Sequence, residues 1–223
     1  MGILKNITDE YFGETVRKED KIDLTSLNVE IVSFTDCNKK FHKIGYKPKD
    51  KDNLKKLLKR MIEMRGDEGD FNDIDTSDIT YMSELFEKNK TFNGDITGWN
   101  VSSVKGMYCM FYNATSFNQP IGDWDVSSVE DMGGMFLNAT YFNQPIGNWK
   151  ISKVRSMSHM FCYAKSFNQP IGNWDVSGVI DMPEMFKKAK SFNQDLSEWN
   201  LNEKMTTNMF DDCPIKDEYK PKM

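Results

Sequence analysis

The chain has 223 residues, of which 39% are hydrophobic and 28% are charged. Its formal net charge of −5 argues against a dedicated nucleic-acid-binding protein, because such proteins usually carry an excess of basic residues. No run of apolar residues approaches the roughly 20 that a membrane-spanning helix needs, and the first residues lack the apolar core of a signal peptide. As the sequence stands, we expect a cytoplasmic monomer with no nucleic-acid partner and no membrane span.

Residues 1–70 do not repeat, and we predict that they form an N-terminal capping region. Residues Val29 to Phe34 alternate between apolar and polar types, which predicts a strand. Residues 52–64 predict an amphipathic helix, because their apolar residues form a stripe on one face: Leu54, Leu57, Leu58, Met61 and Ile62. We expect this helix to cover the exposed core at the start of the repeats that follow.

The predicted helix is part of a basic segment. Between Lys47 and Arg65 there are eight basic and three acidic residues. The segment is either a patch for an anionic partner or a solvated face whose lysine stems lie over apolar surface. We favour the second interpretation, because long basic side chains commonly cover apolar surface in this way.

Residues 71–213 form a tandem repeat with a step of 25 residues. Phenylalanine, asparagine, methionine and alanine positions keep the same step as the tryptophans: Trp99, Trp124, Trp149, Trp174 and Trp199. The register slips by one residue after Trp199, and residues 214–223 form a C-terminal tail. One unit cannot bury its own apolar face, so stacked neighbouring units must supply the core.

Within a unit the apolar spacing changes. From Asp131 to Ala139 the apolar residues recur at steps of three and four, which predicts a short helix. From Asp123 to Val126 they alternate, which predicts a short strand with Trp124 and Val126 facing inward. The expected fold class is therefore an α/β repeat. It is a leucine-rich-repeat-like solenoid with one short strand and one short helix per coil, plus an N-terminal cap containing a helix.

The repeat has a recognisable motif. Residues Phe117 to Phe136 read Phe-Asn-Gln-Pro-Ile-Gly-Asp-Trp-Asp-Val-Ser-Ser-Val-Glu-Asp-Met-Gly-Gly-Met-Phe, and four tandem copies lie between about Ile74 and Cys213. This motif closely resembles the BspA-like leucine-rich repeats, which occur in bacterial surface proteins and mycoplasma-type lipoproteins. The resemblance implies a binding or adhesion scaffold at a bacterial surface, with no family-wide catalytic residues.

Two columns of residues, meaning sets that recur at equivalent positions of successive units, could be functional or structural. The asparagines Asn118, Asn143 and Asn168 could bind a ligand, but buried backbone groups in a stacked turn also need partners. The tryptophans could form a carbohydrate platform, but they occupy an inward position. We interpret both columns as structural.

The candidate binding residues are those that flank each tryptophan, since alternation points them outward. They vary from unit to unit while the inward residues are nearly fixed. We predict a partner-binding surface of six residues: Asp123, Asp125, Asn148, Lys150, Asn173 and Asp175. In a stack, Asp125, Lys150 and Asp175 would be neighbours with alternating charge. The same pattern could serve stability alone.

The sequence offers no catalytic or metal-binding constellation. The two histidines, His42 and His159, are far apart, and Cys37, Cys109, Cys162 and Cys213 show no paired spacing. We therefore expect free thiols, no metal, no cofactor and no enzymatic activity. The predicted function is a protein-interaction or adhesion module with a protein partner. The alternative is a structural spacer or presenting scaffold.

Overall fold

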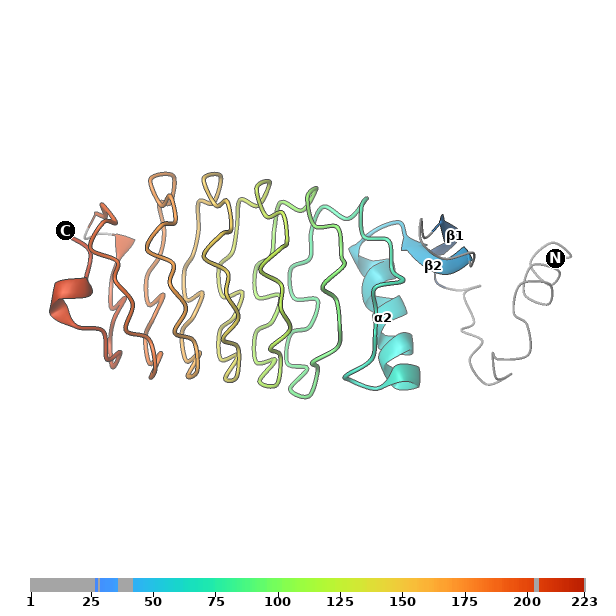
Figure 1. Cartoon of the computed structure of the whole chain (residues 1–223), viewed down its shortest axis with the longest axis horizontal. Coiled ribbons are helices and arrows are strands. Elements are labelled where there is room, and N and C mark those ends of the chain that lie inside the picture. Colours follow the sequence, from blue (N-terminus) through green and yellow to red (C-terminus); the bar gives the residue numbers. More distant parts are fainter. Residues whose placement is uncertain (1–26, 28, 36–41, 203–204, 223) are drawn as a thin grey trace, which may run out of the picture.

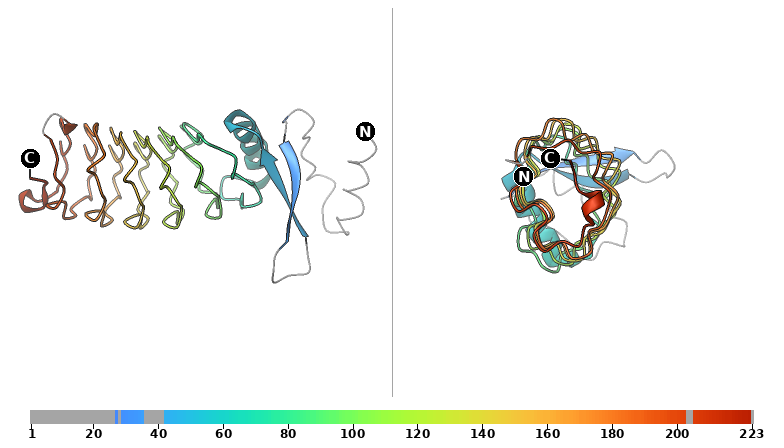
Figure 2. Two further views of the ribbon diagram at one scale, coloured as in Figure 1. Left: turned by 90° about the horizontal axis from the view of Figure 1, so that it is seen from above. Right: turned by 90° about the vertical axis from the view of Figure 1, so that its left-hand side faces the viewer.

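The computed structural model describes residues 27, 29–35, 42–202 and 205–222. Successive 25-residue units lie side by side along the long axis of the molecule, with a hairpin and a helix at one end (Figure 1). Viewed along that axis, the units lie one behind another (Figure 2). The repeat in the sequence is therefore a repeat in space.

The expected alternation of one strand and one helix per unit is wrong. Among the described residues, the only α-helix is α2 (Lys51–Arg65) and the only sheet is the antiparallel pair β1 (Val29–Thr35) and β2 (His42–Pro48). A short 3-10 helix, η3 (Asp217–Tyr219), lies at the other end. Single-residue parallel bridges connect equivalent positions of successive units: Tyr81, Gly106, Asp131, Ser156 and Asp181. The fold is therefore not a leucine-rich-repeat-like solenoid of strands and helices, because its units consist of turns.

The segment expected to be helical, Asp131 to Ala139, contains two left-handed backbone positions. Gly134 has a φ of 61° and Asn138 a φ of 55°, and the equivalent His159 and Tyr163 have 57° and 59°. An α-helix needs negative φ throughout and N–H groups that bond four residues back. Here alternate N–H groups donate to carbonyls of the next unit instead. Apolar residues at steps of three and four also suit such turns, which is why the pattern was misleading.

The segment around each tryptophan, expected to be a strand, is also built from turns. The N–H of Val129 donates to the carbonyl of Val126 at 2.9 Å, and the carboxylate of Asp125 accepts from the N–H of Ser127 at 3.1 Å. Bonds between residues two or three apart close turns, whereas strands bond to a neighbouring strand. Trp124 and Val126 nevertheless face inward as predicted, with exposed fractions of 5% and 1%.

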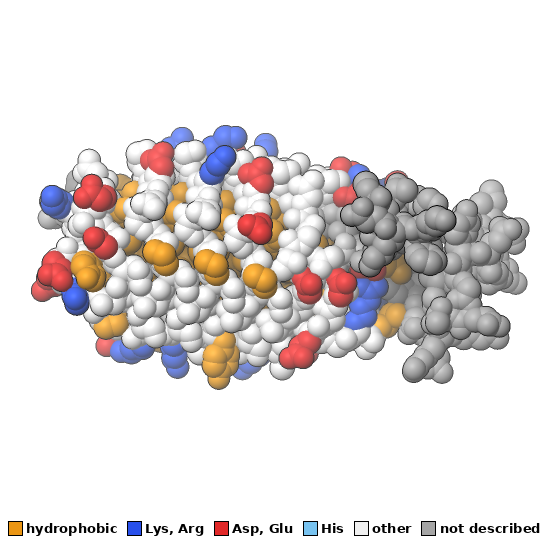
Figure 3. All heavy atoms as spheres, in the orientation of Figure 1, with side chains coloured by type: hydrophobic (Ala, Val, Ile, Leu, Met, Phe, Trp, Pro, Cys, Tyr) orange, Lys and Arg blue, Asp and Glu red, His pale blue; other side chains and the backbone are white. Residues whose placement is uncertain are grey.

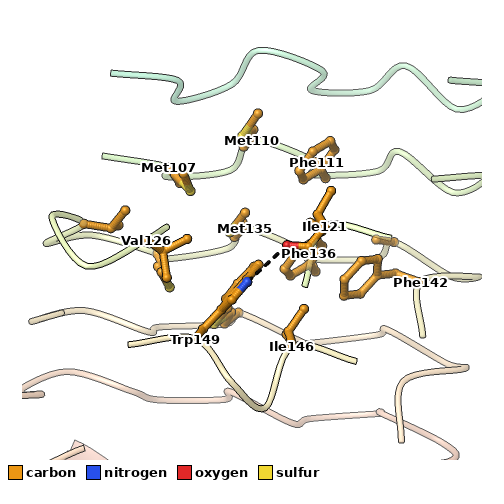
Figure 4. Packing of buried hydrophobic residues seen from close by; sticks show 14 of the residues in the cluster. Met107, Met110, Phe111, Ile121, Val126, Met135, Phe136, Phe142, Ile146 and Trp149 are labelled. Carbon is orange, nitrogen blue, oxygen red and sulfur yellow. Dashed lines mark hydrogen bonds between the residues drawn. The ribbon is translucent and has the colours of Figure 1, made fainter. Parts of the chain in front are cut away.

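Aromatic rings of successive units stack into columns in the core. The ring centroids of Phe111, Phe136 and Phe161 follow at steps of 5.6 Å, with interplanar angles of 3° and 7°. All five repeat tryptophans are between 2% and 5% exposed. Figure 4 shows Trp149 reaching the preceding unit, where its indole Nε1 donates to the carbonyl of Ile121 at 3.2 Å. The prediction that the tryptophans belong to the core is confirmed.

The asparagine column links neighbouring units. The side-chain oxygen of Asn118 accepts from the N–H of Asn143 at 2.9 Å. Gln144 Nε2 donates to the carbonyl of Asn118 at 2.9 Å. The same bond from one asparagine to the next recurs at Asn168 and Asn193. The structural interpretation of this column is confirmed, because each asparagine satisfies a backbone donor that would otherwise be unpaired.

Helix α2 closes one end of the row of units. Asp50 caps its N-terminus by accepting from the N–H of Asn53 at 2.8 Å. Its apolar face is at most 2% exposed and joins the core of the units: Leu54, Leu57, Leu58 and Met61. Strand β2 joins the first unit through Tyr46, whose N–H donates to Asp73 and whose carbonyl accepts from Asp75. Helix α2 contains the helix expected over residues 52–64, and residues 1–26 of the predicted capping region lie outside the described residues.

Candidate protein-interaction surface

The six candidate residues lie together on one exposed face, which we call the polar edge: Asp123, Asp125, Asn148, Lys150, Asn173 and Asp175. All six side chains are exposed. Between each pair lies a buried tryptophan, and Trp124, Trp149 and Trp174 are 5%, 4% and 3% exposed. The tryptophans thus fix the backbone from inside while their neighbours project into solvent. Figure 3 shows one face of the molecule, on which charged side chains of both signs lie above a row of hydrophobic side chains that recurs from unit to unit.

The acidic residues of the polar edge also close turns. Asp175 accepts from the N–H of Ser177 at 3.1 Å and from its hydroxyl at 2.6 Å. These hydrogen bonds lower the pKa of the Asp175 carboxyl below its ordinary value. Hydrogen bonds from Ser127 likewise lower the pKa of Asp125, and the positive charges of Lys150 and Lys153 lower it further. Both carboxylates are therefore ionised and held in one orientation at neutral pH.

Lys150 stands between these two carboxylates without contacting them. Within the described residues, the Lys150 ammonium forms no ion pair shorter than 4.0 Å, although its charge lowers the pKa of Asp125. The equivalent residues Asp125 and Asp175 each cap a turn, whereas a lysine cannot accept such a bond. Lys150 is consequently a basic group that the turn does not use and that a partner can reach.

The sequence interpretation missed two basic residues beside Lys150. Lys153 and Arg155 are exposed on the same unit, and the guanidinium of Arg155 donates to the carbonyl of Gly178 at 2.7 Å. The preceding unit has Ser128 and Glu130 at these positions. Comparing units position by position would have shown that one central unit carries three basic residues between acidic neighbours.

The cysteines that the structure describes are poor nucleophiles. Cys109, Cys162 and Cys213 are free, and Cys162 is 2% exposed. Burial raises the pKa of the Cys162 thiol to about 11, so the reactive thiolate is scarce at neutral pH. Cys37, the fourth predicted thiol, lies outside the described residues.

One cluster of polar side chains lies away from the polar edge. Ser158 Oγ lies 2.6 Å from His159 Nδ1, and His159 Nε2 lies 3.5 Å from Glu184. The His159 side chain is 42% exposed, and none of the three lines the hollow of 510 Å³ beside Arg65 or that of 390 Å³ beside α2. The contact alone does not define an active site.

The described part of the chain lacks two features that would point to other functions. None of its His, Cys, Asp and Glu side chains gather in groups of three or more that could hold a metal ion. None of its helices has the length and apolar character needed to cross a membrane.

The fold and this surface define a class of protein: a tandem-repeat protein with a fixed apolar interior and a variable polar exterior. The model of one protein family matches residues 52–161 and 142–218. The chain belongs to this family, described as "Mycoplasma protein of unknown function, DUF285". Neither the search of curated proteins nor the search of solved structures found a match.

Proposed function

We propose that this chain is a non-enzymatic protein-interaction module whose partner binds the polar edge. The observation that carries the proposal is the division of each unit into a fixed interior and a variable exterior. Packing accounts for the buried tryptophans, whereas the exposed residues beside them change type and charge from unit to unit. Extended surfaces of repeat proteins are commonly binding surfaces.

The charge arrangement supports a protein partner. The basic residues Lys150, Lys153 and Arg155 lie between acidic residues of the two neighbouring units, including Asp125 and Asp175. A surface with both signs in fixed places suits a polypeptide with complementary charges, because such patterns fix register and orient the encounter. A nucleic acid would instead favour a continuous basic surface.

Beyond the family match, we propose that the 25-residue units are related to the BspA-like repeats of bacterial surface proteins. The supporting observation is the unit Phe117–Phe136, repeated in four tandem copies. On this proposal the module binds or adheres at a bacterial surface. The alternative is a spacer that presents another segment and binds nothing through its polar edge.

The test is capture of a partner with charge-reversed variants. The intact chain is used to isolate binding proteins, and the affinity of the isolated partner is then measured for Lys150→Asp and Asp125→Lys. Lys150→Asp is an exposed change and should alter stability by no more than about 0.5 kcal/mol. Asp125→Lys also removes the acceptor of the Ser127 N–H and should cost about 1 kcal/mol. The unfolding curves of both variants are therefore measured beside their affinities, so that a loss of affinity larger than the loss of stability reports on binding. Lys165→Asp, an exposed reversal outside the polar edge, is the matched control.

A partner that binds the control as tightly as the intact chain, but both edge variants at least about ten times more weakly, supports the proposal. Equal affinity for all four proteins would move the binding site away from the polar edge. Failure to isolate any specific partner from either host or bacterial extracts would favour the spacer.

A further inference from the structure

Along one side of the molecule, the units are joined by backbone hydrogen bonds that run in one direction. In the unit beginning at Met157, four alternate N–H groups donate to carbonyls of the following unit at 2.8 to 2.9 Å. The pairs are Met157 with Asp181, His159 with Pro183, Phe161 with Met185, and Tyr163 with Lys187. Along this side of the molecule, each unit is therefore a donor to the unit that follows it and an acceptor from the unit before it.

The same pattern reaches the last unit, residues 205–213. The N–H groups of Glu184, Phe186 and Lys188 donate to carbonyls of this unit at 2.8 to 2.9 Å. The next donors in register are the N–H groups of Asn208, Phe210 and Asp212. These three N–H groups donate to no residue in the part of the chain that the structure describes.

The backbone of the last unit already has the conformation of the earlier donors. Asn208 and Asp212 have φ values of 54° and 57°, and their equivalents Glu184 and Lys188 have 52° and 59°. The unpaired N–H groups are thus aligned as in an occupied ladder. No ordering of this backbone is needed before an acceptor binds, which reduces the entropic cost of binding.

An aromatic side chain lies in the middle of these donors. The ring of Phe210 stacks on that of Phe186 at 5.7 Å with an interplanar angle of 3°. Phe186 has rings on both sides and is fully buried, whereas Phe210 is half-buried. The column of phenylalanines therefore ends at Phe210, which is only half-buried and lies between the donors of Asn208 and Asp212.

The C-terminal segment covers the other side of this end. The N–H of Lys216 donates to the side chain of Asn193 at 3.0 Å, in the place of the next asparagine of the column. The N–H of Leu196 donates to the carbonyl of Tyr219 at 2.9 Å. The segment thus completes the asparagine and tryptophan side and leaves the donors of residues 208–212 unpaired within the described chain.

A second copy of the chain does not fit this edge. Two-fold pairing would bring donors against donors. A head-to-tail copy would have to offer the carbonyls of its first unit, but α2 packs there. Lys55 of that helix donates to the carbonyl of Glu84, and the helix and unit together line one hollow with Leu85 and Phe86.

We propose that the donor edge formed by Asn208, Phe210 and Asp212 binds a segment of another protein that adopts the backbone conformation of a repeat unit, with left-handed residues such as Glu184 and Lys188. The segment supplies carbonyl oxygens at alternate residues and places an apolar side chain, best an aromatic ring, on Phe210. This interface continues the one made between successive units, and it is a form of backbone pairing at an open edge. It is separate from the polar edge, and its test does not depend on the proposed function.

The experiment uses the full chain and a synthetic peptide with the sequence of its own residues 178–191. In the intact protein this segment supplies the carbonyls of Asp181, Pro183, Met185 and Lys187 to the preceding unit, and its phenylalanine would meet Phe210. Titration followed by amide NMR and hydrogen exchange locates the binding. We expect saturable shifts and slowed exchange at the amides of Asn208, Phe210 and Asp212.

The variants are Phe210→Glu and, as the control, Tyr141→Glu, which alters an aromatic residue that is 63% exposed away from this end. The first should weaken peptide binding at least about ten-fold, and the second should leave it unchanged. A scrambled peptide should not bind. Shifts confined to α2 or the polar edge, equal binding by both variants, or no saturable binding would overturn the proposal.

Discussion

The two ends of the row of units are closed in different ways. At one end, α2 lays Leu54, Leu57 and Leu58 over the core, and its own backbone bonds are made within the helix. At the other end, the last unit has the turn structure of its predecessors and keeps three N–H groups without acceptors in the described chain. A helix can end a ladder of hydrogen bonds because it satisfies its own backbone, whereas one more unit of turns only moves the unpaired groups along.

The largest expected loss of stability follows from a substitution in the middle of the row of units and not at either end. Trp149→Ala should lower the free energy of unfolding by about 3 to 5 kcal/mol. The substitution opens a cavity between two units and removes the hydrogen bond to the carbonyl of Ile121. Chemical denaturation measures this loss. An unfolding curve like that of the intact chain would mean that the tryptophans contribute little to the core.

Comparable substitutions at the two ends should differ in cost. Leu57→Ala should cost about 2 to 5 kcal/mol, because Leu57 is fully buried between α2 and the first unit. Phe210→Ala should cost only about 1 kcal/mol, since its side chain is only half-buried. Denaturation of both variants under the same conditions gives the comparison. Equal costs would show that the second end is as well covered as the first.

The asparagine column tests whether the middle depends on polar links. Asn143→Ala should cost about 1 to 3 kcal/mol, because it removes the acceptor of the Asn168 N–H and leaves that donor unpaired. Asn148→Ala is the control, as Asn148 is exposed on the polar edge. Thermal melting of the two proteins should separate them. A control that melts as low as Asn143→Ala would argue against a specific role for the column.

The smallest expected effect concerns the reactivity of the cysteine thiols. It reports how well the last unit is covered. Cys213 is only half-buried near that end, whereas Cys162 is 2% exposed in the middle. Burial raises the pKa of both thiols, that of Cys162 to about 11. Alkylation at pH 8, followed by peptide mass spectrometry, should modify Cys213 before Cys162. Raising the pH toward the folded-state pKa of Cys162 should also destabilise the fold, because the unfolded thiol ionises first.

The sequence predicted which side chains face inward, but not the backbone that places them. Trp149 and Asn118 occupy the positions expected from the 25-residue repeat. The helix and the strand predicted within each 25-residue unit were wrong, because the spacing of apolar residues does not distinguish a helix from successive turns. The left-handed positions give a weak signal: Gly134 and Asn138 favour positive φ, but Cys109 and Tyr163 do not.

The polar edge could be predicted in large part from the sequence, whereas the donor edge could not. Exposure of Lys150 and Asp125 follows from the alternation around the buried tryptophans, and the structure places both at the surface. The basic group of Lys153 and Arg155 could have been found by aligning the units. The donor edge at Asn208 could not, since it depends on the direction in which backbone bonds run between units.

The predominant direction of the hydrogen bonds between units has an electrostatic consequence. In the unit of residues 155–166, four backbone N–H groups point toward the following unit and two, those of Arg155 and Ser166, point back. Aligned peptide dipoles add, as they do in a helix, so the row carries partial positive charge at its free N–H end and partial negative charge at the opposite end. The side chains match this polarity. Lys55 of α2 donates to the carbonyl of Glu84 at the negative end, and the exposed Asp211 and Asp212 lie at the positive end. The excess of forward N–H groups thus gives the row of units a polarity along its length, although Asp212 is also paired with Lys190 at 2.6 Å.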